Sequence, residues 1–131
     1  MQYAPVIGRV LFSAAFIMFG VNHIMDPGAM TGMVPAFLPA KTAVVILTGI
    51  ISIAGGVSVL FGYKAKLGAL ILFFFVLSTA VLVWGGQFLD GDPIGTPMFF
   101  KDLSMAGAAL LIHHFGAGPM SLDAKSESSD E

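Results

Sequence analysis

The sequence predicts an all-α integral membrane protein, a bundle of four transmembrane helices with almost no water-soluble mass. Hydrophobic residues make up 56% of the chain and charged residues only 11%, whereas a typical globular domain has about 25% charged residues. The mean hydropathy is +0.90. Four charge-poor runs are each long enough to cross a hydrocarbon core of about 30 Å. A soluble chain with so few charges could not cover its surface, so we expect this surface to face lipid.

The first expected helix has its core at residues 4–24. This run is apolar except for Arg9, and it ends at the helix-breaking pair Asp26-Pro27. A removable signal peptide is the alternative. However, Arg9 lies well inside the run, and no small-x-small cleavage site follows before His23. We therefore expect a retained membrane helix.

The second and third helices are expected at residues 42–63 and 67–85. The second run carries no charge and ends at a short link that contains Lys64 and Lys66. The third is the most lipid-like run of the chain and ends at the turn-forming pair Gly85-Gly86. Both are long enough to span a bilayer.

The fourth expected helix, at residues 98–115, is more polar than the others. Lys101 and Asp102 lie in its first turns and His113 lies near its end, where Gly116 suits a C-terminal cap. We therefore take residues 1–122 as one transmembrane domain. The polar tail at residues 123–131 is expected to be disordered.

The distribution of Lys and Arg predicts the orientation. Basic residues favour the cytoplasmic side of a membrane, and Lys64 and Lys66 stand in the shortest link. With four crossings, both termini would then face the cytoplasm, most simply of a bacterial cell whose cytoplasmic membrane holds the protein. Arg9 agrees with this orientation, whereas Lys41 in the first long loop opposes it.

Polar residues on facing sides of the first and last helices form the candidate site. An ionisable group inside a bilayer costs roughly 2.5–3.5 kcal/mol, so those that are retained usually face protein or water. At helical spacing, Arg9 shares a face with His23, and Asp102 shares a face with His113. Antiparallel packing would bring Asp102 level with His23 at one end and Arg9 level with His113 at the other. The candidate binding residues are Arg9, His23, Lys101, Asp102 and His113.

Simpler interpretations of the same residues stay open. Arg9 could extend its long side chain to lipid headgroups, and His23 and Lys101 could mark the membrane interface. Asp102 could complement the dipole of its helix, and His113 could be an ordinary interfacial histidine. The chain has no cysteine, and the histidines at the two ends are too far apart to hold one haem. We therefore expect no metal site.

Several short motifs follow one another along the chain. They are Gly8-Arg9, Gly20-x-Asn22-His23-x-x-Asp26-Pro27, Gly32-Met33-Val34-Pro35, Gly55-Gly56-x-x-x-Leu60-x-Gly62, Lys101-Asp102-Leu103 and Gly116-x-Gly118-x-x-Ser121-Leu122-Asp123. In this order they resemble the DoxX family, which consists of small four-helix membrane proteins, and the resemblance covers roughly residues 7 to 123. Two departures stand out: many members carry an acidic residue in the second helix where this chain has Thr48 to Ser52, and many have lysine at the position of His23.

The resemblance implies a redox setting, because relatives include a membrane subunit of thiosulfate:quinone oxidoreductase and proteins linked to oxidative-stress complexes. The expected function is a membrane subunit or anchor of such an assembly. It would have no intrinsic cofactor or catalytic motif, and a quinone is the candidate ligand, beside Arg9 or His23. The alternatives are a carrier or binding protein for a small lipophilic molecule and a structural assembly partner without ligand. Expected partners are membrane lipid, redox-enzyme subunits and a second copy of the chain. The net charge of −2 gives no reason to expect nucleic acid.

Overall fold

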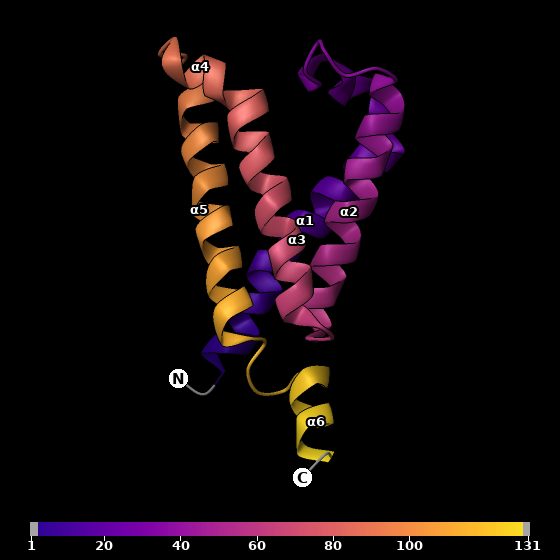
Figure 1. The fold of residues 1–131 in the computed structure, drawn as a ribbon, viewed down its shortest axis with the longest axis vertical. Helices are drawn as coiled ribbons and strands as arrows, with labels where there is room; N and C mark the ends of the chain where they lie inside the picture. Colours follow the sequence, from indigo (N-terminus) through magenta and orange to yellow (C-terminus); the bar gives the residue numbers. More distant parts are fainter. Residues whose placement is uncertain (1–2, 130–131) are drawn as a thin grey trace.

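The computed structural model describes residues 3–129, with side chains up to residue 125, and this part of the chain is helical and contains no strand. The expected all-α class is therefore confirmed. The elements are α1 (Ala4–Met25), the 3-10 segment η1 (Pro27–Met33), α2 (Lys41–Phe61), α3 (Ala65–Thr79), the π-helical segment η2 (Ala80–Trp84), α4 (Gly85–Leu89), α5 (Gly95–Phe115) and α6 (Leu122–Ser129). Figure 1 shows the long helices side by side.

Three stretches of the described chain are long and apolar enough to cross a membrane: α1, α2 and the continuous helix Ala65–Leu89, which runs from α3 through η2 into α4. They correspond to the first three expected helices. The helix α5 has 21 residues, as many as α2. It is not among these three stretches, and it carries the charged pair Lys101 and Asp102.

The helices are packed in a chain of neighbours. The close pairs are α1 with α2, α2 with α3, and α3 with α5, so α3 lies between α2 and α5 (Figure 1). The helices α1 and α5 are not a close pair by their backbones, whereas we expected the first and last helices to pack together. Side chains still bridge them, because Lys101 of α5 reaches the ring of Phe19 of α1.

Small residues bring α1 and α2 into close contact. A Cβ atom added at Gly20 would lie 2.6 Å from the carbonyl oxygen of Gly49. One turn further, the buried Ser52 hydroxyl donates a hydrogen bond of 2.6 Å to the carbonyl oxygen of Phe16. Small side chains at such contacts let membrane helices approach closely, and the interhelical hydrogen bond adds to the packing.

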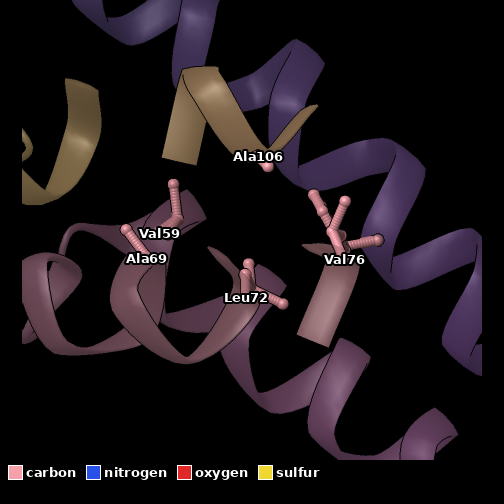
Figure 2. Close-up of a cluster of buried hydrophobic side chains, with 6 residues drawn as sticks. Val59, Ala69, Leu72, Val76 and Ala106 are labelled. Atoms are coloured by element: carbon pink, nitrogen blue, oxygen red, sulfur yellow. The ribbon is translucent and has the colours of Figure 1, made fainter. Parts of the chain in front are cut away.

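The core lies where α3 meets the other long helices. Figure 2 shows Val59 of α2, Ala106 of α5 and residues of α3 gathered in one cluster. Leu72, which is fully buried, lies over Gly55 of α2, where an added Cβ would come within 2.6 Å of its side chain. The buried members of the cluster are Phe16, Val59, Ala69, Leu72, Val76 and Ala106.

The segment after α5 differs from the sequence prediction. We expected a disordered tail from residue 123, but the structure has the helix α6 at Leu122–Ser129, and residues 130 and 131 lie outside the described chain. The turn between α5 and α6 uses positive φ angles at Gly116, Gly118 and Met120. It places α6 beyond the helix ends, at the same end of the molecule as the start of α1 (Figure 1).

Candidate functional site

The polar side chains of the bundle gather at its two ends. We call the end that holds the turn between α2 and α3 the basic end, because Lys64 and Lys66 lie there. The opposite end, which holds η1 and α4, is called the loop end (Figure 1). Of the five candidate residues, Arg9 and His113 lie at the basic end, and His23, Lys101 and Asp102 lie toward the loop end.

Arg9 is buried at the basic end, with 4% of its surface exposed. Its Nη2 donates hydrogen bonds to the carbonyl oxygens of Met120 at 2.9 Å and Pro119 at 3.3 Å. Its Nη1 donates a longer bond, 3.4 Å, to the carbonyl oxygen of Leu60. The guanidinium therefore faces protein rather than lipid headgroups, and it ties α1 to the end of α2 and to the segment after α5.

Asp123 completes this network by capping α3. Its two carboxylate oxygens accept hydrogen bonds from the backbone N–H groups of Lys64 at 2.7 Å and Ala65 at 2.9 Å. Its own N–H donates to the carbonyl oxygen of Gly62 at 2.7 Å. A helix start leaves backbone N–H groups unpaired and attracts negative charge, so this carboxylate does the work of an N-cap from a distant part of the chain.

Gly62 is required at the centre of the basic end. Its φ angle is +68°, and an added Cβ would collide with Ser121 and come within 2.6 Å of Nη1 of Arg9. Both the backbone conformation and the space therefore exclude a larger residue. His113 lies nearby, where its Nδ1 forms a hydrogen bond of 2.9 Å with the carbonyl oxygen of Lys66.

The loop end holds the charged pair of α5. Nζ of Lys101 lies 3.5 Å from Oδ1 of Asp102 and 5.1 Å from the centroid of the Phe19 ring. Asp102 is 5% exposed, and its second oxygen, Oδ2, has no hydrogen-bond partner in the described structure. A buried acceptor without a partner is costly and needs an explanation, for example a bound group that donates to it.

His23 also lies near Phe19 but is directed toward α2. Its Nδ1 is 2.5 Å from the carbonyl oxygen of Phe19, and an added Cβ at Gly49 would lie 2.8 Å from the Cβ of His23. Within the described residues, no hydrogen bond or ion pair joins His23 to Asp102. Phe19 links the two parts instead, through its carbonyl oxygen to His23 and through its ring to Lys101.

A metal centre has no candidate in the part of the chain that the structure describes, because no three of its His, Asp and Glu residues come together as a possible ligand set. The polar groups of the two ends can instead form hydrogen bonds and ion pairs with organic ligands. At the loop end a buried acceptor, Oδ2 of Asp102, is left without a partner in the described structure, beside a cation and an aromatic ring.

Comparison with known proteins supplies the family. The DoxX family model matches residues 4–86, more than half of the chain. The chain belongs to the DoxX family. It is 29% identical over 121 residues to the inner membrane protein YphA of Escherichia coli (strain K12), covering 90% of this chain and 86% of that protein. It is also 29% identical over 119 residues to the inner membrane protein YqjF of the same strain, covering 90% and 88%. No solved structure matches significantly.

These relatives support a membrane protein of DoxX type, as the apolar helices do. The family match runs from α1 into the start of α4, so it includes Arg9 and His23. Lys101, Asp102 and His113 lie beyond the matched residues. Their surroundings are known from the structure, which places Lys101 near the ring of Phe19 and His113 at the carbonyl oxygen of Lys66.

Proposed function

We propose that this DoxX-family protein is a membrane subunit or anchor of a quinone-linked oxidoreductase assembly and binds the quinone head group at the loop end. The observation that supports this proposal is the unpartnered Oδ2 of the buried Asp102, which lies beside the Lys101 ammonium and the Phe19 ring. Together these three groups complement the polar and flat parts of a quinone.

Each group has a defined role in this proposal. The Lys101 ammonium would donate a hydrogen bond to a quinone carbonyl oxygen, and Oδ2 of Asp102 would accept one from a quinol hydroxyl. The Phe19 ring offers an aromatic face for stacking. Small-molecule sites commonly combine apolar walls with a few placed polar groups.

Access from lipid is consistent with the packing. The helices α1 and α5 are not a close backbone pair, and the Lys101 side chain is 40% exposed while that of Asp102 is 8% exposed. A ligand dissolved in the bilayer could therefore reach the exposed ammonium and extend toward the carboxylate. Its isoprenoid tail would remain in lipid.

Electron transfer in this proposal belongs to partner subunits. The chain has no cysteine, and the described His, Asp and Glu residues do not gather as a metal ligand set. The role of this chain would be to hold the quinone beside a redox-active partner. In this arrangement α5 is the fourth crossing, and both termini face the cytoplasm, on the side of Lys64 and Lys66.

The experiment uses Trp84, the one tryptophan of the chain, which ends η2. The full-length protein in lipid nanodiscs is titrated with a short-chain ubiquinone analogue while tryptophan fluorescence is recorded. We expect saturable quenching that weakens at least tenfold in Lys101→Met and Asp102→Asn and is unchanged in Lys41→Gln, at the start of α2. Quenching that is unsaturable, or equal in all four proteins, would reject the quinone site.

A second candidate, a carrier or binding protein for a small lipophilic molecule, is favoured by a groove along α1. This groove has a volume of about 460 Å³ and is lined almost entirely by apolar side chains: Val10, Ala14, Ile17, Met18, Val21, Asn22 and Leu60. Mass spectrometry of lipids extracted from gently purified protein separates the two candidates. A quinone supports the first, and a different enriched lipid or metabolite supports the second.

A further inference from the structure

Two lysines at the basic end, Lys64 and Lys66, form no ion pair with an acidic side chain among the described residues. Asp123 reaches the turn that holds Lys64, but its two carboxylate oxygens accept hydrogen bonds from backbone N–H groups and not from an ammonium. The ammonium groups of Lys64 and Lys66 are therefore accessible to an external anion.

Exposed aromatic rings flank both lysines. Nζ of Lys64 lies 5.7 Å from the centroid of the Tyr63 ring, and Tyr63 is 57% exposed. The side chain of Lys66 lies beside the C-terminal end of α5, because a Cβ added at Gly116 would come within 3.2 Å of Cε of Lys66. The neighbouring Phe115 is 74% exposed. Aromatic residues with this exposure are typical of the headgroup level of a membrane.

The position of the lysines along the helices fits the same level. Lys64 stands between two membrane-capable stretches, Lys41–Phe61 and Ala65–Leu89, and Lys66 is the second residue of the later stretch. His113 forms its hydrogen bond to the backbone of Lys66, and His114 stacks edge to face on Phe115 with centroids 4.6 Å apart. Cationic groups from α3 and imidazoles from α5 thus meet where these helices leave the hydrocarbon region.

The loop end has the opposite character. Asp26, Asp90 and Asp92 lie there, whereas the described acid at the basic end is Asp123, which caps α3 next to Lys64. By the charges of the described residues, an anionic headgroup is therefore favoured at the basic end over the loop end.

We infer that the basic end binds the phosphate of an anionic phospholipid between Lys64 and Lys66, with Tyr63 and Phe115 in contact with the adjoining part of the lipid. Each lysine near an anionic membrane surface contributes about 1 kcal/mol, which corresponds to roughly a fivefold change in affinity. This inference does not depend on the quinone site, which lies at the other end.

The test compares the full-length protein and three variants in detergent by native mass spectrometry, with dioctanoyl phosphatidylglycerol or dioctanoyl phosphatidylcholine as the probe. Phosphatidylglycerol should bind more tightly than phosphatidylcholine to the unmodified chain. Lys64→Gln and Lys66→Gln should each weaken phosphatidylglycerol binding roughly fivefold. Lys41→Gln, which removes an exposed lysine at the loop end, is the matched control and should leave binding unchanged.

Three results would overturn the inference. Equal binding of the two lipids would remove the preference for anionic headgroups. An equal loss in Lys41→Gln would show a general effect of net charge. Inorganic phosphate that competes with phosphatidylglycerol at equal concentration would show a plain anion site without a lipid contribution. Because these exposed lysines make no hydrogen bond through their ammonium groups in the described structure, the variants are expected to fold.

Discussion

The guanidinium of Arg9 donates a hydrogen bond to the carbonyl oxygen of Met120, 2.9 Å away. This contact joins the first helix to the last turn before α6, and it explains how a permanent charge is retained within a long apolar run. Backbone carbonyl groups from two other segments replace the water that Nη1 and Nη2 would otherwise need, while Nε has no partner in the described structure. The same contact also fixes the turn that carries Asp123 to α3.

Arg9→Met should destabilise the protein by about 1.5–3 kcal/mol, because a charged donor is removed and carbonyl oxygens of the buried turn lose their partner. Arg9→Lys should lose less, since it keeps the charge but has fewer donors in the required directions. Thermal unfolding in detergent, followed by Trp84 fluorescence, measures the difference. Lys41→Met serves as the control at an exposed cation. Equal midpoints for Arg9→Met and the control would contradict the structural role.

Asp123→Ala should loosen the first turn of α3 by roughly 0.5–2 kcal/mol, the usual range for loss of an N-cap side chain. Asp123→Asn keeps one acceptor oxygen and should lose less. Hydrogen–deuterium exchange of a peptide that covers residues 62–70 reports the effect directly. Exchange that is unchanged there, while residues after 116 become less protected, would mean that α3 does not need this cap.

Asp92 predicts a pH dependence at the start of α5. Its Oδ1 accepts hydrogen bonds from the N–H groups of Gly95 and Ile94, and these bonds lower the pKa of Asp92 below its ordinary value. The carboxylate therefore supports this turn at all pH values above the ordinary aspartate pKa of about 3.9. The support is lost as the pH falls through the lower folded value.

Asp92→Ala isolates this contribution. Hydrogen–deuterium exchange of residues 92–98 should be faster in the variant than in the unmodified protein at pH 6, after correction for the intrinsic rate. The difference should shrink when the proteins are compared at the lowest pH at which both remain folded. A difference that grows toward acid pH would have the wrong sign.

Gly20→Val should separate α1 from α2. An added Cβ already meets the carbonyl oxygen of Gly49 at 2.6 Å, and overpacking of this kind costs about 1–3 kcal/mol. Gly8→Val in the same helix is the matched control, because nothing lies within 4 Å of its added Cβ. Thermal unfolding of the two variants should differ clearly, and similar midpoints would show that the close contact of α1 with α2 is not rigid.

The proposed orientation is tested with single cysteines, which the chain otherwise lacks. Gly32→Cys lies in η1, where an added side chain meets nothing within 4 Å. With four crossings and both termini in the cytoplasm, it should react with an impermeant thiol reagent in intact cells. Ser126→Cys should react only after the cells are opened. Labelling of both positions in intact cells would place residue 126 outside the cytoplasm. Either α5 would then not cross the membrane, or the predicted side of the C-terminal end would be wrong.

The helices were predictable from the sequence because their cause is local. Charge-poor runs and their breaking residues define α1 and α2 within a few residues. The π-helical segment η2 within the continuous helix Ala65–Leu89 was not predictable from the local sequence, and α5 packs against it. The predicted levels of Arg9 with His113 and of His23 with Asp102 rested on helical spacing and on antiparallel packing of the first and last helices.

The capping role of Asp123 was missed because it depends on contact between distant segments. The composition of residues 123–131 suggested a solvated tail, and nothing near Asp123 indicates a partner. A signal did exist at the other end of the contact: α3 begins at Lys64-Ala65 without any of the residues that commonly cap a helix. A helix start without a local cap indicates that another segment supplies one.

The Arg9 network also constrains how the protein is made. The hydrogen bond between Arg9 and Met120 spans 111 residues, so its acceptor does not exist when α1 leaves the ribosome. At about 5–20 residues per second, the segment whose carbonyl oxygens accept hydrogen bonds from Arg9 is synthesised on the order of ten seconds after α1. During that interval Arg9 must stay near water or lipid phosphate. The final seating of α1 is thus a late event in the folding of these helices, completed only after the segment with Met120 has been synthesised.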